Sequence, residues 1–276
     1  MFKFFDSHTH LQSSVFDNDR EIIANRILID NIGVVNVGAD KESSIKAVEL
    51  AKKYPNNMRA AVGCHPHHID EFSAQGGPAS GWNYEFFKKL AQEPEVVAIG
   101  ECGLDYCFRN EEIKTKNEVI KKQKDVFIEH IKLAKEVDKP IMVHCRDAFG
   151  DLIEILKTEI NPPAGGLKPS IIHFFTGTLE DAKQLLEMGF YFTFNGLITF
   201  NRDFDEIIKY IPLNRILLET DAPYVAPLSH RKERNEPSYI VETAQKMAEI
   251  KGVSLEEIGK QTTENSGKCY NILKSL

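Results

Sequence analysis

The segment FFDSHTHL, residues 4–11, places two histidines directly after a short apolar run. Residues 1–5 are apolar and aromatic except for one lysine, which predicts a short buried strand. Alternate residues of a strand point to the same side, so His8 and His10 point the same way. Two imidazoles together at a strand end form half of a metal site. A pair of surface histidines in a turn is the structural alternative.

Length and composition describe a globular protein that folds in water. The chain has 276 residues, which fits one α/β barrel, with 42% hydrophobic and 27% charged residues. No apolar run approaches the roughly 20 residues that span a bilayer, and the first residues lack the pattern of a secretory signal. We therefore expect a single domain over residues 1–276, located in the cytoplasm and without membrane contact.

Cysteine count and net charge narrow the possible partners. Five cysteines at irregular spacing favour reduced thiols over a disulfide framework. Cys102 and Cys107 could suggest a thiolate zinc site, but no second cysteine pair completes it. The net charge of −7 argues against a broad basic face for duplex DNA. A phosphate substrate stays open, because bound metal ions can be the largest local charges in a site.

Short apolar segments alternate with helical segments along the chain. Strands are predicted at residues 1–5, 33–38, 58–63, 96–100, 140–143, 170–172, 190–194 and 216–218. Helices are predicted at 17–31, 41–54, 82–91, 116–137, 148–158, 179–188 and 203–210, then from 237, at 254–261 and at 263–273. This alternation predicts a (β/α)8 TIM barrel. An open doubly wound sheet needs a glycine-rich phosphate turn after its first strand, where this chain has SHTH.

Polar side chains gather at the predicted strand ends. In chain order they are His8 and His10, His65, Glu101, His144, His173 and Asp221. The carboxyl ends of all strands in a barrel converge on one face, where active sites lie. Leaving His65 aside, six nitrogen and oxygen ligands exceed the need of one tetrahedral ion. They suit two ions about 4 Å apart that share a bridging carboxylate.

Each of these residues also has an ordinary structural interpretation. His144 and His173 could be core histidines bonded to the backbone. Glu101 could belong to an ion pair at the barrel mouth, and Asp221 could cap the following turn. The remaining histidines are interpreted as loop, helix or surface residues: His67, His68, His130 and His230.

Seven blocks of sequence follow one another in a fixed order. They are residues 5–11 (FDSHTHL), 63–67 (GCHPH), 99–106 (IGECGLDY), 143–146 (VHCR), 172–177 (IHFFTG), 218–224 (LETDAPY) and 234–237 (RNEP). Together they resemble the TatD family of metal-dependent deoxyribonucleases, over nearly the whole chain. The resemblance implies a barrel with two divalent metals that hydrolyses phosphodiesters in nucleic acid, usually from the 3′ end.

The resemblance also implies roles for the residues at the strand ends. Glu101 resembles the carboxylate that bridges the metals, and Asp221 the carboxylate beside the attacking water. Four histidines resemble terminal ligands, two for each ion: His8 and His10, then His144 and His173. His/Asp/Glu sites accept Zn²⁺, Mn²⁺ and, less readily, Mg²⁺, so the native metal stays open.

Two departures from the family pattern concern the substrate. Residues 173–177 read HFFTG where the family often has HCFSG, so Phe174 replaces a cysteine. Residues 231–237 read RKERNEP where RGKRNEP is usual. Glu233 therefore replaces a cation that could meet phosphate, which leaves the affinity of that loop for substrate open.

We expect a metal-dependent nuclease in which Asp221 orients the attacking water and accepts its proton. His65, on the same rim, is expected to bond the phosphate or to protonate the leaving group. Glu101 is expected to serve both metals.

Substrate contacts are predicted from side chains near the strand ends. Arg146 could clamp a phosphate or form a structural ion pair, and Arg234 is a second predicted contact. Phe175, Phe194 and Tyr224 could stack on a base, although barrel packing is favoured for Phe194. With a net charge of −7, few phosphate contacts and a shallow dependence of binding on salt are expected. The substrate predicted from the resemblance is a single-stranded DNA end.

Two other functions stay open. A hydrolase of small amides, esters or lactones would share the metal site, with loops 64–81 and 222–235 around a small pocket. A metal-binding or nucleic-acid-binding protein without catalysis is disfavoured by the complete ligand set. DNA versus RNA preference and oligomeric state are left open, and a monomer is compatible with the sequence.

Overall fold

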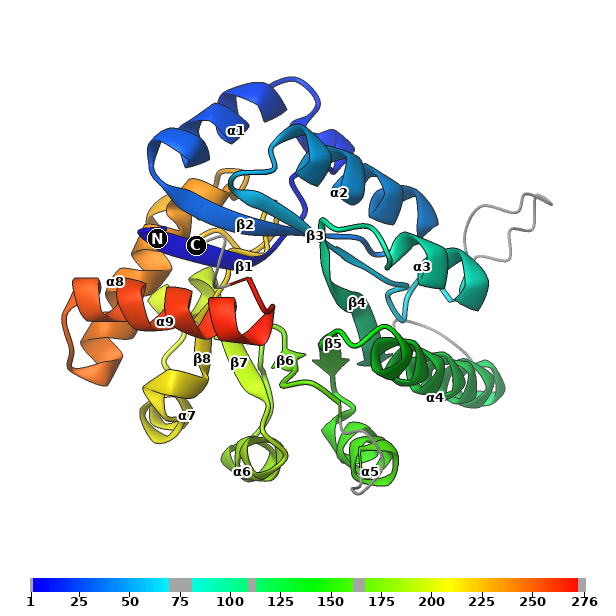
Figure 1. Ribbon diagram of the computed structural model, residues 1–276. Coiled ribbons are helices and arrows are strands. Elements are labelled where there is room, and N and C mark those ends of the chain that lie inside the picture. Colours follow the sequence, from blue (N-terminus) through cyan, green and yellow to red (C-terminus); the bar gives the residue numbers. More distant parts are fainter. Residues whose placement is uncertain (1, 70–80, 109–112, 161–166, 273–276) are drawn as a thin grey trace.

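Eight parallel strands close into one barrel in chain order, with β8 paired to β1, in the computed structural model (Figure 1). The model describes residues 2–69, 81–108, 113–160 and 167–272. Within them the strands are β1 Phe4–Thr9, β2 Ile32–Val37, β3 Met58–Val62, β4 Val96–Asp105, β5 Ile141–Arg146, β6 Ile171–Ile172, β7 Tyr191–Phe194 and β8 Ile216–Leu218. The predicted (β/α)8 barrel is confirmed.

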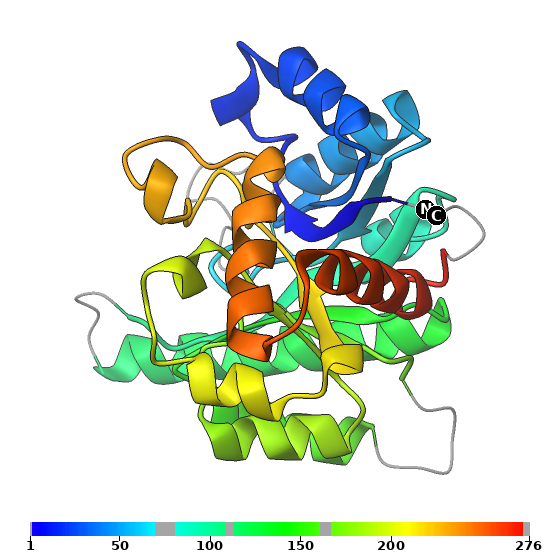
Figure 2. The same cartoon turned by 90° about the vertical axis from the view of Figure 1, so that its left-hand side faces the viewer.

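Helices surround the barrel on its outside (Figure 1). They are α1 Arg20–Ile29, α2 Lys41–Lys53, α3 Tyr84–Leu90, α4 Ile113–Glu136, α5 Phe149–Glu159, α6 Leu179–Glu187, α7 Asp205–Tyr210, α8 Ile240–Lys251 and α9 Leu255–Cys269. Figure 2 shows α9 lying against β1 and next to α8. Of the helices described, none has the length and apolar character that a bilayer span requires.

The prediction of two helical pieces near the C-terminus is wrong, because α9 is one continuous helix. Residues 254–261 and 263–273 were expected to form two pieces, but one helix covers Leu255–Cys269, and Leu273 lies outside the described residues. The hydroxyl groups of Thr262 and Ser266 donate hydrogen bonds to carbonyl oxygens one turn earlier, at 2.7 and 3.0 Å. Polar residues that suggest a break are therefore satisfied inside the helix.

One apolar cluster fills the barrel interior. Every strand contributes side chains to it, for example Phe5 from β1 and Leu217 from β8. Side chains from all eight strands can meet only along the barrel axis, so this cluster lies inside the barrel. Tyr270, directly after α9, joins the same cluster. Its buried hydroxyl donates to the carbonyl oxygen of Ser7 at 3.0 Å. The last helix is thereby attached to the backbone just before His8.

Three strands run further than predicted, which places polar residues inside the barrel wall rather than after it. The predicted strands stopped near residues 5, 100 and 143, whereas β1, β4 and β5 continue to Thr9, Asp105 and Arg146. Gly103 permits the extension of β4. It has φ +142°, and a Cβ there would lie 2.0 Å from the carbonyl oxygen of His144 on β5. His8, Glu101 and His144 therefore lie within strands, although the strand pairing shifts register between Asp6 and Thr9 on β1 and between Ile99 and Cys102 on β4.

Candidate metal centre

The six predicted metal ligands converge at the carboxyl end of the barrel. His8 lies on β1 and His10 directly after it, while Asp221 follows β8. The Nε2 atoms of His8 and His10 are 3.1 Å apart. They lie 3.8 and 3.5 Å, respectively, from Oδ1 of Asp221. These three residues are called the first half of the centre.

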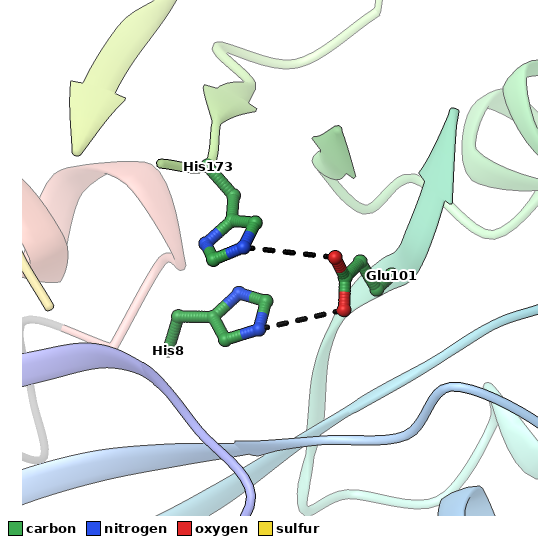
Figure 3. A group of neighbouring side chains, drawn as sticks. All are labelled: His8, Glu101 and His173. Atoms are coloured by element: carbon green, nitrogen blue, oxygen red, sulfur yellow. Dashed lines mark ion pairs between the residues drawn. The ribbon is translucent and has the colours of Figure 1, made fainter. Parts of the chain in front are cut away.

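The second half of the centre consists of His144 on β5 and His173 after β6. Nδ1 of His144 lies 3.0 Å from Oε1 of Glu101, and Nε2 of His173 lies 3.6 Å from the same oxygen. The other oxygen of Glu101, Oε2, faces the first half, 3.5 Å from His8 and 3.9 Å from His10. Figure 3 shows His8 and His173 both directed at the carboxylate of Glu101. One carboxylate oxygen thus faces each half.

The spacing of these donor atoms fits bound ions. Ligands at 2.0–2.2 Å from one ion, at tetrahedral or octahedral angles, are about 3.0–3.5 Å apart. The spacings to Glu101 and within the first half are within a few tenths of an ångström of this range. Neutral imidazoles and ionised carboxylates are suitable donors for Zn²⁺ or Mn²⁺. The residues present therefore fit a divalent metal centre that Glu101 and the two halves would hold.

Burial and neighbouring charges control the protonation of the centre. Burial, together with the charge of His173, lowers the pKa of His8 to about 3, so its ring is neutral. Burial alone would raise the pKa of Glu101, but its imidazole neighbours, His65 first and then His144 and His8 through hydrogen bonds, hold it well below its usual range. The site thus presents a neutral imidazole and an ionised carboxylate, the forms that bind cations.

Buried carboxylates orient both imidazoles of the second half. Nδ1 of His173 donates to Glu219 at 2.7 Å, and Nε2 of His144 donates to Asp105 at 3.0 Å. Burial would lower the pKa of His173, but the charge and hydrogen bond of Glu219 raise it to about 10. Each contact turns the other ring nitrogen toward Glu101, the arrangement expected of metal-binding histidines.

The two orienting carboxylates, Asp105 and Glu219, were not predicted as site residues. For Asp105 strand alternation contains a signal, because it lies four residues after Glu101 on β4 and residues at even spacing on a strand share a face. Glu219 lies after the end of β8, where alternation gives no such signal.

The first half is held by backbone groups instead. Nδ1 of His10 donates to the carbonyl oxygen of Val37 at 2.7 Å. Nδ1 of His8 is buried and has no hydrogen-bond partner among the residues that the structure describes. Asp6 accepts hydrogen bonds from the backbone N–H of His8 and from the N–H and hydroxyl of Thr220, at 3.2, 2.9 and 2.5 Å. Asp6 therefore fixes the end of β1 against the segment that carries Asp221.

His65 stands beside the second half as a hydrogen-bond donor. Its Nδ1 accepts the backbone N–H of His67 at 3.1 Å, so the neutral ring carries its proton on Nε2. Nε2 lies 3.6 Å from Oε1 of Glu101. Burial holds the pKa of His65 well below its usual range. Because Nε2 carries a proton, His65 is better suited to donate a hydrogen bond to an anionic substrate than to bind a metal ion.

A cavity of about 1060 Å³ opens over the centre. Arg146 and Tyr224, two predicted substrate contacts, line it. Arg146 is exposed and has no carboxylate partner in the described part of the chain, which leaves its guanidinium available. Tyr224 is 59% exposed, and its ring centre lies 5.9 Å from that of His10.

Arg234 and Glu233 do not line this cavity. Arg234 pairs with Asp19 at 2.6 Å and lies over the ring of Phe16. The structure thus shows Arg234 in an ion pair, and its substrate contact stays a prediction. Glu233 accepts a hydrogen bond from His230 at 2.7 Å, so its carboxylate is paired within the same loop. Its substitution for a cation does not place a negative charge in the cavity.

The predicted base contact of Phe175 is wrong, because this side chain is 1% exposed and packs against Phe192 and Phe194 of β7. Phe194 is 2% exposed, which confirms the barrel packing favoured for it. Phe174 lines the cavity instead. Its φ of +45° interrupts strand alternation directly after His173, so the residue expected to share the face of His173 turns into the core.

Comparisons with known proteins agree with this geometry. A family model described as "TatD related DNase" matches residues 5–271. The chain is 37% identical to the uncharacterized metal-dependent hydrolase YabD of Bacillus subtilis, over 97% of this chain and 99% of YabD. It is 32% identical to the 3′-5′ ssDNA/RNA exonuclease TatD of Erwinia tasmaniensis, over 97% of this chain and all of the relative.

Solved structures show the same architecture. The TatD homologue YJJV of Escherichia coli K12 superposes with a TM-score of 0.84, at 25% identity over 98% of each chain. The lactonase Lmo2620 of Listeria monocytogenes has a TM-score of 0.64 at 16% identity, over 97% of this chain and 94% of the lactonase. The second likeness concerns the fold alone.

Proposed function

This chain belongs to the TatD family of metal-dependent hydrolases acting on ester bonds, and from that premise we propose that it is a two-metal nuclease. It removes nucleotides from the 3′ end of single-stranded DNA, with RNA as the second substrate to test. The carrying observation is Glu101, whose two oxygens face histidine pairs on opposite sides. The Erwinia relatives, described as 3′-5′ ssDNA/RNA exonucleases, support the direction of cleavage.

Asp221 acts as the general base in this proposal. Two bound divalent ions would lower the pKa of a water molecule and polarise the phosphoryl group. Asp221 would accept the proton of that water. Its Oδ1 lies beside the imidazoles of the first half, which would hold one ion, so it is close to where the water would be bound. The N–H of Asp221 donates to the carbonyl oxygen of His8 at 2.9 Å, which keeps the carboxylate in register with β1.

His65 and Arg146 bind the phosphate. His65 offers its Nε2 proton while staying neutral, so it adds no charge that would repel the ions. Arg146 lines the cavity and supplies a planar guanidinium for bidentate contact with a phosphate. The other lining cation, Lys46, is already paired with Glu42 at 2.6 Å. Few phosphate contacts follow, which suits a short single-stranded end and predicts a shallow dependence of binding on salt.

The experiment is metal-dependent release of label from single-stranded DNA labelled at either end. We expect early release of mononucleotides from the 3′ label, loss of activity with chelator, and recovery after metal is added back. The fold should survive chelation, because the barrel core consists of apolar strands. Equal cleavage of closed circular duplex, or cooperative unfolding on chelation, would contradict the proposal.

The alternative, a hydrolase of small amides, esters or lactones, is tested in the same assay with those substrates. Of the loop 64–81 that would enclose a small pocket, residues 70–80 lie outside the described residues. Turnover of a small lactone without turnover of DNA would favour this alternative.

A further inference from the structure

Phe174 is an apolar side chain at a charged site. It directly follows His173, is partly exposed and lines the cavity over the metal centre. Its ring centre lies 6.0 Å from that of His173, with the ring planes 71° apart. Because its ring is partly exposed to solvent beside the predicted metal ligand His173, Phe174 contributes little to the packing of the hydrophobic core.

The backbone of Phe174 is held in a conformation that non-glycine residues rarely adopt. Its φ is +45°, in the left-handed region. The N–H of Phe174 donates to the hydroxyl of Thr193 at 2.9 Å. That hydroxyl in turn donates to Glu219, the carboxylate that accepts Nδ1 of His173 at 2.7 Å. Strained backbone persists where surrounding contacts hold it, and here the same contacts hold a metal ligand.

The shared contacts have a geometric consequence. The hydrogen bonds through Thr193 and Glu219 connect the position of Phe174 to the orientation of His173. The backbone of Phe174 is therefore fixed relative to the second half, and its ring, 6.0 Å from that of His173, lies close to the phosphate that would be cleaved there. On the other side of the cavity, Tyr224 stands near His10 in the first half. An aromatic ring therefore flanks each half of the centre.

Resting on the proposed nuclease function, we propose that Phe174 stacks on a nucleobase beside the scissile phosphate and sets the base preference of the enzyme. Phe174 has no hydrogen-bonding group, so it reads no base edge. Every base has an aromatic face, and stacking on a protein ring stabilises binding of any base in proportion to its contact area. The order of preference is therefore purine, then pyrimidine, then an abasic sugar.

The test compares four proteins on 3′-labelled oligonucleotides. The substrates end in adenosine or cytidine, or carry an abasic sugar at one of the last two positions. Phe174→Leu keeps apolar bulk but removes the aromatic face, and Phe174→Tyr restores the face. Cysteine is avoided, because a thiolate next to His173 would be a new metal ligand. Tyr210→Leu removes an exposed ring on α7, outside the residues that line the cavity, as the matched control.

We expect the wild type, Phe174→Tyr and Tyr210→Leu to prefer a base over an abasic sugar at one of the two positions by about 5- to 100-fold in kcat/KM. Phe174→Leu should lose most of this ratio through KM, with metal content and activity on the abasic substrate unchanged. An unchanged ratio in Phe174→Leu, or no base dependence in the wild type, overturns the role of Phe174 and leaves the nuclease standing. A wild type that cleaves none of these oligonucleotides overturns both.

Discussion

The two halves of the metal centre offer two imidazoles each, but different partners hold them. In the second half, His144 and His173 donate to the buried carboxylates of Asp105 and Glu219. In the first half, His10 donates to a backbone carbonyl oxygen. The first half instead places its own carboxylate, Asp221, within 4 Å of both imidazoles.

The two halves therefore differ in the position of their carboxylates relative to the imidazoles. A carboxylate behind an imidazole makes the ring a stronger ligand and fixes its orientation. A carboxylate beside the ligands can also exchange a proton with water. We infer that the second half is built to hold an ion, and the first half to hold an ion and perform proton transfer.

The strongest test of the comparison removes the residue that both halves share. Glu101→Ala should weaken binding of both ions and lower turnover by roughly 10³-fold or more, because several kcal/mol of charge stabilisation are lost. Metal titration by calorimetry, with activity at saturating metal, measures both effects. Loss of one ion with normal affinity for the other would mean that Glu101 belongs to one half only.

Asp221→Asn should sharpen the comparison within the first half. The amide keeps the shape and can still offer an oxygen, but it cannot accept a proton at neutral pH. Turnover should fall by roughly 10²–10⁴-fold while substrate affinity changes little. Full recovery with excess metal would show a ligand role instead, and near-normal turnover in a metal-replete variant would remove Asp221 from catalysis.

Glu219→Gln should affect the second half alone. Loss of the carboxylate behind His173 should weaken one ion by about 10- to 100-fold, and excess metal should restore most of the turnover. The matched control is Glu206→Gln, the same change on exposed α7. Equal weakening of both ions in Glu219→Gln would erase the distinction between the halves. Thermal unfolding of each variant separates metal loss from loss of the fold.

His130, outside both halves, gives the reference for a histidine that is buried without a carboxylate partner. It donates to Val126 and accepts the N–H of Cys64. Burial lowers its pKa to about 3. Because the folded pKa lies below the usual 6.5, its contribution to stability is present above pH 6.5 and is lost as the pH falls toward 3.

Urea unfolding of wild type and His130→Gln measures this contribution. Between pH 7.5 and 4.5 the wild type should lose about 2–3 kcal/mol more than the variant, whose amide does not titrate. Parallel pH profiles for the two proteins would show that His130 titrates normally in the fold.

The barrel and the convergence of the candidate ligands could be predicted, because both leave local signals. Apolar runs that alternate with helical spacing predict the strands, and polar residues at the ends of those runs predict the site. His8, His173 and Asp221 all stand where a run stops.

Other features depend on contacts that no local pattern contains. The left-handed φ of Phe174 exchanges the environments of Phe174 and Phe175, and it is held by Thr193 from another strand. Arg234, the cation of the RNEP motif, forms an ion pair with Asp19, which lies 215 positions away in the chain. Tertiary partners of this kind become visible only once the barrel is closed.

The closure of the barrel has a consequence for the synthesis of the protein. Ser7 on β1 donates to the carbonyl oxygen of Leu218 on β8, a contact between residues 211 positions apart. A ribosome therefore releases His8 and His10 early and Asp221 late. Until the eighth strand has emerged, the first two ligands belong to an unclosed sheet. A chain truncated before this point lacks Asp221, so the six predicted ligands can come together only after residue 221 has been translated.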